Sequence, residues 1–232
     1  MIPRLIHQTA KTADLPRREQ MFQQALIKLH PGWKYKLWTD EDNLAFVKSE
    51  FPEFFDVFVG LPKNIMRADV IRYLLMDRLG GLYLDTDYEM LKPFDMVEHD
   101  CVLPLETAGD LNPSSRIANS VFAAAPGHPF FRRVIDRLKS NPPLDPQTDV
   151  LTSTGPHFIS EVLHSMSSEE MTVFTPRCEL FNPPTPIGSR RRQVIVDAGV
   201  AYGIHHCHGS WRDYSIWEKV RLHVSQLIQR LT

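Results

Sequence analysis

Long apolar segments are absent from this chain of 232 residues. No run approaches the roughly 20 apolar residues that a membrane-spanning helix needs. The first residues, 1–7, also lack the basic start and the apolar stretch of a signal peptide. We therefore expect a cytoplasmic protein, with membrane association as an alternative, or a protein of the Golgi lumen if a membrane anchor has been removed ahead of Met1.

Cysteine is scarce, and neither sign of charge is in large excess. The three cysteines, Cys101, Cys178 and Cys207, are odd in number and far apart, so they predict neither a disulfide framework nor a CxxC zinc site. A reducing compartment is the simpler interpretation. The formal net charge of −2 argues against nucleic acid as a partner, because nucleic-acid-binding domains are usually strongly basic.

The residues that are present suit a single globular domain spanning residues 1–232. Hydrophobic residues make up 43% of the chain and charged residues 23%, which allows a sizeable core. Apolar periodicity and Gly/Pro punctuation predict helices at 17–29, 43–49, 63–79, 129–139, 158–164 and 216–231. Strands are predicted at 4–8, 35–38, 82–84, 101–105, 120–125, 194–196 and 201–205. This alternation predicts an α/β fold with a Rossmann-like mixed sheet flanked by helices.

The predicted helix 63–79 carries an acid and a base on its inward face. On a wheel of 3.6 residues per turn, Asp69 and Arg72 lie together with apolar residues, opposite Arg67 and Arg78. Such a pair is costly to bury unless its members are paired or bound to something polar. By helix periodicity alone, a structural ion pair is favoured over a role in ligand binding.

Two aspartates follow the predicted strand 82–84 directly. Alternate residues of an extended segment face the same way, so Asp85 and Asp87 converge while Thr86 points elsewhere. They lie at the carboxyl end of a strand, where open α/β sheets bind their ligands. Two convergent carboxylates repel each other unless a cation lies between them. Oxygen ligands suit Mg²⁺ or Mn²⁺ with substrate phosphates as co-ligands.

Two sequence blocks resemble a known family. Residues 67–73 (RADVIRY) and 80–87 (GGLYLDTD) are similar to the D-x-D sugar-binding region of glycosyltransferase family 32. That family includes the yeast initiating α-1,6-mannosyltransferase and bacterial polysaccharide enzymes, and the same blocks resemble the glucosyltransferase domains of large glucosylating toxins. Looser matches follow in family order: IPRLIHQ at 2–8, PGW at 31–33 with Trp38, Asn119, GHP at 127–129, TGP at 154–156 and HGSW at 208–211.

The resemblance implies a GT-A-like fold and a metal-dependent transferase. It implies Mn²⁺ or Mg²⁺ as cofactor, a UDP- or GDP-sugar donor, a saccharide or lipid-linked acceptor, retention of configuration at the transferred carbon, and a role in polysaccharide biosynthesis. In this scheme the departing phosphate takes the proton of the acceptor, so no separate base is needed.

Site residues follow from the same resemblance. Asp69 and Arg72 would bind hydroxyl groups of the donor sugar, and Tyr83 would pack beside the nucleotide ribose. Asp85 would contact ribose or metal, and Asp87 would ligate the metal.

Five further residues outside these two blocks complete the predicted site. The C-terminal HGSW segment would close over the diphosphate, with His208 or Ser210 completing the metal shell and Trp211 bonding a phosphate oxygen. His7 of the opening motif is placed among the donor-binding residues. Asn119 is a candidate for steadying the reacting sugar.

The chain departs from the family pattern near the predicted base-binding surface. Relatives often carry a tryptophan shortly after the opening Ile-His, where this chain has Thr9 and Ala10. Either Trp33 or Trp38 supplies the stacking surface, or the base is held loosely.

Two other function classes use similar residues. A haloacid-dehalogenase-type phosphatase also has a D-x-D after a strand, but normally near the N-terminus and closely followed by Thr or Val. A catalytically silent sugar-nucleotide-binding module would keep the fold and tolerate the loss of Asp87.

Three basic or histidine-rich features have simpler interpretations. The segment 205–208 (HHCH) cannot bring four adjacent side chains to one ion, so one useful histidine at a strand end is favoured over a zinc site. Residues 190–192 (RRR) are interpreted as a solvated loop rather than a site for an anionic headgroup. The helix 216–231 is expected to pack on the domain, with peripheral membrane contact as the alternative.

Overall fold

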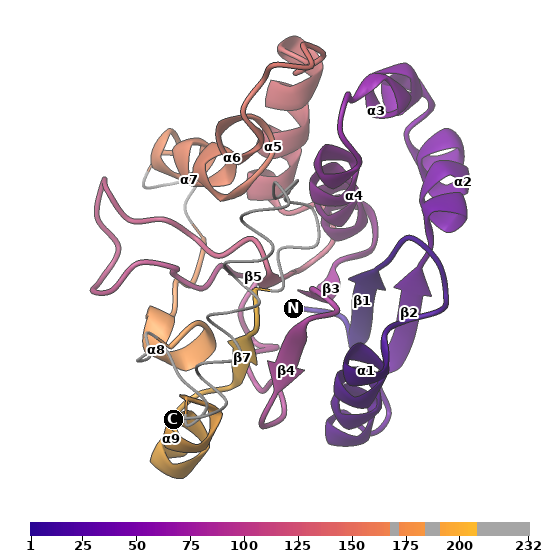
Figure 1. Ribbon diagram of the computed structural model, residues 1–232. Helices are drawn as coiled ribbons and strands as arrows, with labels where there is room; N and C mark the ends of the chain where they lie inside the picture. Colours follow the sequence, from indigo (N-terminus) through magenta and orange to yellow (C-terminus); the bar gives the residue numbers. More distant parts are fainter. Residues whose placement is uncertain (168–171, 184–190, 208–232) are drawn as a thin grey trace, which may run out of the picture.

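A computed structural model describes residues 1–167, 172–183 and 191–207 (Figure 1). The strands are β1 (Leu5–Thr9), β2 (Lys34–Trp38), β3 (Gly81–Leu84), β4 (Tyr88–Met90), β5 (Cys101–Val102), β6 (Val121–Ala124) and β7 (Gly203–His205). The helices are α1 (Arg17–Leu29), α2 (Asp40–Glu50), the 3-10 turn η1 (Pro52–Phe54), α3 (Phe55–Gly60), α4 (Asn64–Leu79), α5 (Pro129–Ser140), α6 (Val150–Ser153), α7 (Pro156–His164), α8 (Cys178–Phe181) and α9 (Arg191–Ala198).

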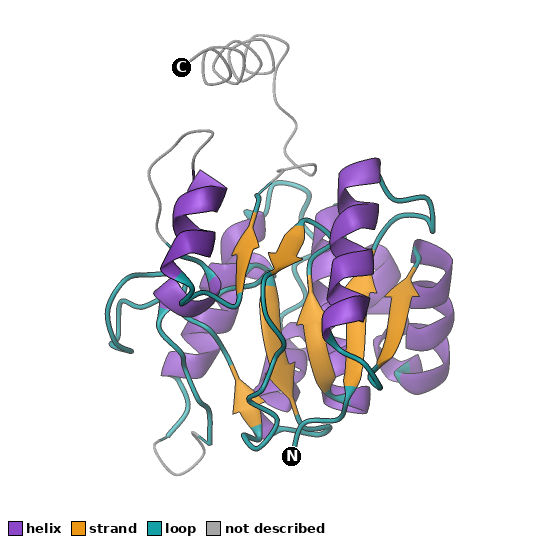
Figure 2. Ribbon diagram, turned by 90° about the horizontal axis from the view of Figure 1, so that it is seen from below, coloured by secondary structure: helices purple, strands orange, loops and turns teal. Residues whose placement is uncertain are grey.

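The main sheet is mixed, as the sequence predicts. Its strand order is β2-β1-β3-β6-β5, with β1 parallel to both neighbours and β6 antiparallel to β3 and β5. A separate antiparallel pair joins β4 to β7. Seen from below, the strands lie between helices on both sides (Figure 2).

The central strand β3 is buried on both faces, as a strand between two helical layers should be. Tyr83 packs into the larger apolar cluster with α4, α5 and α7. Leu82 and Leu84 face the other cluster, which includes Leu26 of α1. The residue that follows β3 is therefore held at a fixed point, at the carboxyl edge of the sheet.

Two glycines allow α4 to run directly into β3. Gly80 and Gly81 have φ of +61° and +104°, in the left-handed region that other residues rarely adopt. A Cβ on Gly81 would lie 2.4 Å from the carbonyl oxygen of Leu5 on β1. A side chain at this position would therefore push apart the two strands that carry the site.

Most predicted elements in the described residues are confirmed, and three differ. The predicted strand 201–205 is shorter, since β7 begins at Gly203. The predicted strand 194–196 is wrong, because these residues lie in α9. The run of β-branched residues misled the prediction, yet Val194 and Val196 are exposed and only Ile195 packs into a small core. The predicted strand 101–105 is shorter, since β5 ends at Val102. Beyond it, Leu103 and Leu105 donate backbone hydrogen bonds to the carbonyl groups of Phe174 and Pro176.

The predicted helix 216–231 lies outside the described residues, and the assignment of 1–232 to a single domain stays a prediction. In the described part of the chain, no helix is both long and apolar enough to cross a bilayer.

Candidate active site

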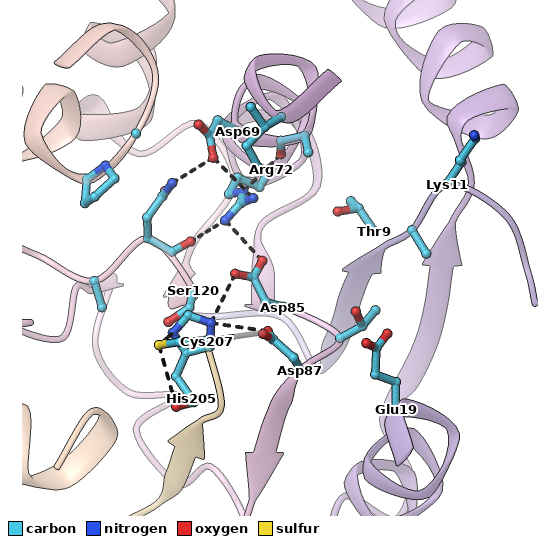
Figure 3. A pocket seen from close by; sticks show the side chains of 18 of the residues that line it. Thr9, Lys11, Glu19, Asp69, Arg72, Asp85, Asp87, Ser120, His205 and Cys207 are labelled. Carbon is cyan, nitrogen blue, oxygen red and sulfur yellow. Dashed lines mark hydrogen bonds and ion pairs between the residues drawn. The ribbon is translucent and has the colours of Figure 1, made fainter. Parts of the chain in front are cut away.

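Asp85 and Asp87 stand where β3 ends and β4 begins. The amide of Asp85 donates to the carbonyl of Ser120, and its own carbonyl accepts from the amide of Tyr88, which closes a tight turn. Both carboxylates border the same cavity, so their predicted convergence is confirmed. Thr86, which the sequence predicts to point elsewhere, also borders this cavity. Figure 3 shows Asp85 and Asp87 together below Asp69 and Arg72 of α4.

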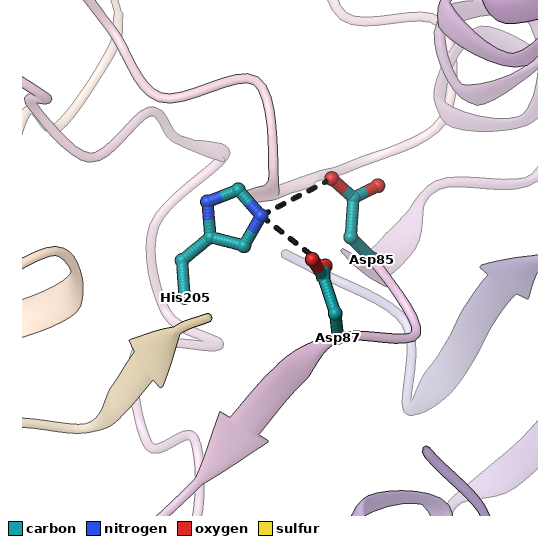
Figure 4. A group of neighbouring side chains, drawn as sticks. All are labelled: Asp85, Asp87 and His205. Atoms are coloured by element: carbon teal, nitrogen blue, oxygen red, sulfur yellow. Dashed lines mark ion pairs between the residues drawn. The ribbon is translucent and has the colours of Figure 1, made fainter. Parts of the chain in front are cut away.

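A histidine from β7 faces the two aspartates. The β4–β7 register pairs Tyr88 with His205, and the amide of His206 donates to the carbonyl of Asp87. The Nε2 of His205 lies 3.2 Å from Asp87 Oδ1 and 3.8 Å from Asp85 Oδ2. Figure 4 shows the three side chains converging. One ligand atom from each lies within 4.8 Å of the others, so the group can surround a single ion.

The electrostatics of this group favour a cation. Burial is the largest single effect and lowers the pKa of His205, but the hydrogen bond to Asp87, the contact with Cys207 and the charges of both aspartates raise it to about 10. Burial raises the pKa of Asp85, against the lowering effect of Arg72. A protonated His205 therefore balances the carboxylates, and a divalent ion would take over that charge. Two carboxylate oxygens and one imidazole nitrogen fit Mn²⁺ or a similar ion.

The two inward-facing charged residues of α4, Asp69 and Arg72, are linked by an ion pair to Asp85 of the metal group. Asp69 and Arg72 are 3% and 4% exposed, and Arg72 Nη2 lies 3.2 Å from Asp69 Oδ1. Arg72 Nη1 lies 3.1 Å from Asp85 Oδ1. The guanidinium thus bridges two carboxylates, which its planar fork suits. The predicted inward orientation of Asp69 and Arg72 is confirmed.

Asp69 is held by two further donors. Asn119 Nδ2 donates to its Oδ1 at 2.8 Å, and Thr154 Oγ1 donates to its Oδ2 at 2.9 Å. Burial raises the pKa of Asp69 to about 6, despite the opposing effects of Arg72 and these hydrogen bonds. Tyr73 lies behind them, with its hydroxyl 2.7 Å from Asn119 Oδ1. Asn119 therefore reaches the site, and its side chain steadies Asp69.

Tyr83 and His7 lie behind the site rather than on its wall. The Tyr83 hydroxyl donates to Asp85 Oδ1 at 2.9 Å, while the side chain is fully buried. His7 accepts from the indole N–H of Trp38 at Nδ1 and donates from Nε2 to the carbonyl of Gly80. Burial lowers the pKa of His7 to about 4, so it stays neutral. The structure does not bring His7 to the cavity where the sequence places donor binding.

The cavity itself measures about 520 Å³ and is partly open to solvent. Among the described residues, its walls come from the β1–α1 loop, the start of α4, the D-x-D turn, Asn119 with Ser120, the α6–α7 region and the segment after β7. Figure 3 shows Thr9, Lys11 and Glu19 across the cavity from His205. This volume is in the range of small-molecule sites.

Neither tryptophan considered for base stacking reaches this cavity. Trp38 is 6% exposed and packs on Phe46, and Trp33 packs against His30 and Phe94. The described walls include Thr9 and Ala10 but no phenylalanine, tyrosine or tryptophan. The alternative in which Trp33 or Trp38 supplies the stacking surface is therefore not supported by the described walls, and how the base is held stays a prediction.

The structure does not describe three residues of the predicted site. His208, Ser210 and Trp211 lie outside the described residues. The structure adds His205 to the metal group, which sequence reasoning singled out only as one useful histidine in the segment 205–208. It also adds Thr154, whose only sequence signal is the loose TGP match at 154–156.

Comparisons with known proteins point to the same family as the D-x-D motif. Residues 16–103 match the family model described as the glycosyltransferase sugar-binding region containing a DXD motif. The chain is 39% identical over 166 residues to a mannosyl phosphorylinositol ceramide synthase of Saccharomyces cerevisiae, covering 70% of this chain and 42% of the relative. It is 38% identical over 162 residues to an inositol phosphoceramide mannosyltransferase of Schizosaccharomyces pombe, covering 68% of this chain and 44% of that relative. The chain thus spans less than half the length of these two curated relatives.

A solved structure shows the same architecture. The PaToxG glycosyltransferase superposes with a TM-score of 0.51 at 18% identity, covering 70% of this chain and 69% of that one. At this identity the likeness concerns the fold alone, and the predicted GT-A-like fold is confirmed.

Proposed function

The chain carries the sugar-binding region of the DXD glycosyltransferases and resembles glycosyltransferase family 32, and from this premise we propose that it transfers a sugar from a nucleoside-diphosphate donor with the help of a divalent metal. The observation that carries the proposal is one cavity in which Asp85, Asp87 and His205 converge beside the buried pair of Asp69 and Arg72.

The roles of the residues follow from their places. Asp85, Asp87 and His205 would hold the metal, which supplies positive charge to the diphosphate leaving group. Asp69 presents a carboxylate fixed by Arg72, Asn119 and Thr154, which suits hydrogen bonding to sugar hydroxyls. Arg72 also holds Asp85 in place. His208, Ser210 and Trp211 remain proposed partners of the diphosphate.

The chemistry is a single exchange at the anomeric carbon. The bond from that carbon to the phosphate oxygen breaks, a bond to the acceptor oxygen forms, and the acceptor proton goes to the departing phosphate. We propose retention of configuration, since this route needs no free carboxylate as base. Arg72 and Tyr83 engage Asp85, so Asp85 is not available as a nucleophile.

The same engagement weighs against a phosphatase of the haloacid-dehalogenase type, whose first aspartate must attack phosphate. For the transferase, the two relatives suggest mannose as the sugar and the inositol-phosphate headgroup of a sphingolipid as the acceptor class. A lipid acceptor would bring the protein to a membrane surface, whichever compartment holds it.

A donor screen tests the proposal. The protein is incubated with Mn²⁺ and a panel of UDP- and GDP-sugars, including GDP-mannose, and sugar release to water is followed, because transfer to water needs no acceptor. Mannosyl transfer to phosphatidylinositol or inositol phosphoceramide in detergent is then assayed. Release of phosphate from simple phosphomonoesters would support the phosphatase instead, and binding of donors without any turnover would support the silent module.

A further inference from the structure

His206 is fixed at a junction of three elements, next to the residue that faces the aspartates. Its ring stacks on Phe22 of α1 with centroids 4.9 Å apart and an interplanar angle of 15°. Its Nε2 lies 3.0 Å from Glu89 Oε2 on β4, and its Nδ1 lies 2.9 Å from Arg18 Nη2 on α1. Phe22 and Glu89 are 9% and 7% exposed, so two of the three partners are buried.

The two hydrogen bonds show which nitrogen of the His206 ring carries the hydrogen. A guanidinium can only donate, so Arg18 donates to Nδ1, and Nδ1 carries no hydrogen. The hydrogen therefore lies on Nε2 and is donated to the carboxylate of Glu89. Both polar atoms of the ring are used, and its face is covered by Phe22. The ring has one orientation that satisfies all three contacts.

The contacts of His206 with α1 and β4 stabilise the short strand β7. β7 has three residues and pairs with β4 alone in its sheet, and an isolated two-stranded pair is marginally stable in water. Immediately after His206, the chain takes a left-handed turn at Cys207, whose φ is +50°. Contacts on His206 therefore hold the point at which the chain leaves β7.

The position of His206 determines the position of His205. The amide of His206 donates to the carbonyl of Asp87 at 3.1 Å, so the backbone between the two histidines is tied to the D-x-D turn. The other ring nitrogen of His205, Nδ1, lies 3.3 Å from Cys207 Sγ. With Nδ1 engaged, Nε2 is the nitrogen that faces the carboxylates.

We propose that Arg18 and Glu89 are positioning residues that act through their hydrogen bonds to His206 to fix His205 toward Asp85 and Asp87 before a metal binds. The inference rests on the proposed function, since it takes this group as the metal site. Residues that orient a metal ligand contribute strongly to metal affinity, commonly tenfold or more. Helix α1 contributes no ligand to the described metal group, but through Arg18 it helps to hold the ligand His205 in place.

Two substitutions of His206 distinguish the effect of its hydrogen bonds on metal affinity from the effect of its aromatic ring. His206→Phe keeps an aromatic ring on Phe22 but removes both hydrogen bonds. His206→Gln loses the ring but can donate its amide N–H to Glu89 and accept from Arg18. His99→Phe is a matched control, because His99 also stacks on a phenylalanine, Phe174 at 4.3 Å, on another part of the surface. Glu89→Gln serves as a milder second variant should His206→Phe not fold.

The measurement is the dissociation constant for Mn²⁺ alone, from the electron paramagnetic resonance signal of the free ion, together with the melting temperature. We expect His206→Phe to bind Mn²⁺ roughly tenfold more weakly, Glu89→Gln several-fold more weakly, and His206→Gln and His99→Phe within about twofold of wild type. If His206→Phe binds Mn²⁺ with wild-type affinity, the inference is wrong but the metal assignment stands. The same holds if His206→Gln loses as much Mn²⁺ affinity as His206→Phe. Failure of the wild-type protein to bind Mn²⁺ overturns the metal assignment, and the inference with it.

Discussion

Arg72 Nη1 lies 3.1 Å from Oδ1 of Asp85, and this ion pair joins the inward face of α4 to the end of β3. The same guanidinium reaches Asp69 at 3.2 Å. Both carboxylates therefore share one cation, and Arg72 connects Asp69 at one part of the cavity to Asp85 of the metal group at another.

Replacing this guanidinium by an ammonium should be costly. Arg72→Lys keeps the charge, but a lysine cannot bridge two carboxylates in the geometry of a planar fork. We expect unfolding in urea to show a loss of about 1.5–3 kcal/mol, the usual contribution of one buried hydrogen bond to a charged group. Arg137→Lys is the control, because its pair with Glu161 at 3.0 Å is exposed and should contribute little. Equal stability changes in the two variants would contradict the bridging role.

Asp69→Asn should separate function from folding. Asparagine keeps the shape, can still pair with Asn119 and Thr154, and keeps an amide oxygen that can accept from Arg72. Burial already disfavours the charge of Asp69 and raises its pKa to about 6, so the loss of that charge should cost little stability, but the substitution removes the negative charge presented to the donor sugar. We expect the melting temperature to change little and the transfer rate to fall at least roughly a hundredfold, about 3 kcal/mol. Circular dichroism melting and donor hydrolysis measure the two quantities. A large loss of stability with a proportionate loss of activity would favour a purely structural ion pair.

His7 should make the protein less stable in mild acid. Its pKa is lowered to about 4 in the fold against 6.5 in the unfolded chain, so between these values only the unfolded state takes up the proton. Stability therefore rises with pH across this window and is lost as pH falls from 6.5 toward 4. Asp69 acts in the opposite direction between pH 3.8 and about 6, because its pKa is raised in the fold.

A variant isolates the histidine from these other groups. Between pH 7.5 and 5, wild type should lose about 2 kcal/mol more than His7→Gln, from 1.36 kcal/mol per unit over the titrated part of the window. Urea unfolding at both pH values measures the difference. An identical pH dependence in the two proteins would mean that His7 takes up a proton in the native state.

The sequence predicts the parts of this site that depend on local periodicity. The 3.6-residue period of α4 places Asp69 and Arg72 inward, as predicted. Asp85 and Asp87 do converge as predicted, but a tight turn after β3 brings them together and not an extended segment. His205 depends instead on the register of β4 with β7, a pairing between segments far apart in the chain. No local pattern encodes that register. The error at α9 has another cause: the β-branched run 194–196 predicts a strand, but in the helix only Ile195 is buried, so the run is not a buried strand.

The last prediction concerns the metal, and its argument begins with geometry. Asp85 and Asp87 converge on His205 with one ligand atom of each inside 4.8 Å, and such carboxylates repel unless a cation lies between them. The leaving diphosphate gains negative charge in the same cavity, so the ion that satisfies the aspartates also stabilises the transition state. Asp87→Asn keeps the shape and one oxygen ligand but removes a full charge. We expect the rate to fall at least about a hundredfold, on the order of 3 kcal/mol.

Chelation tests the same assignment without a mutation. EDTA should abolish sugar transfer, and added Mn²⁺ or Mg²⁺ should restore it in wild type but not in Asp87→Asn. Asp100→Asn is the matched control, because that aspartate is exposed and pairs with the amino terminus, away from the cavity. Its rate and its response to chelation should equal those of wild type. If the chelated wild-type protein transfers sugar at its full rate, the ion has no catalytic role, and Asp85, Asp87 and His205 must then balance their charges through the proton on His205 alone.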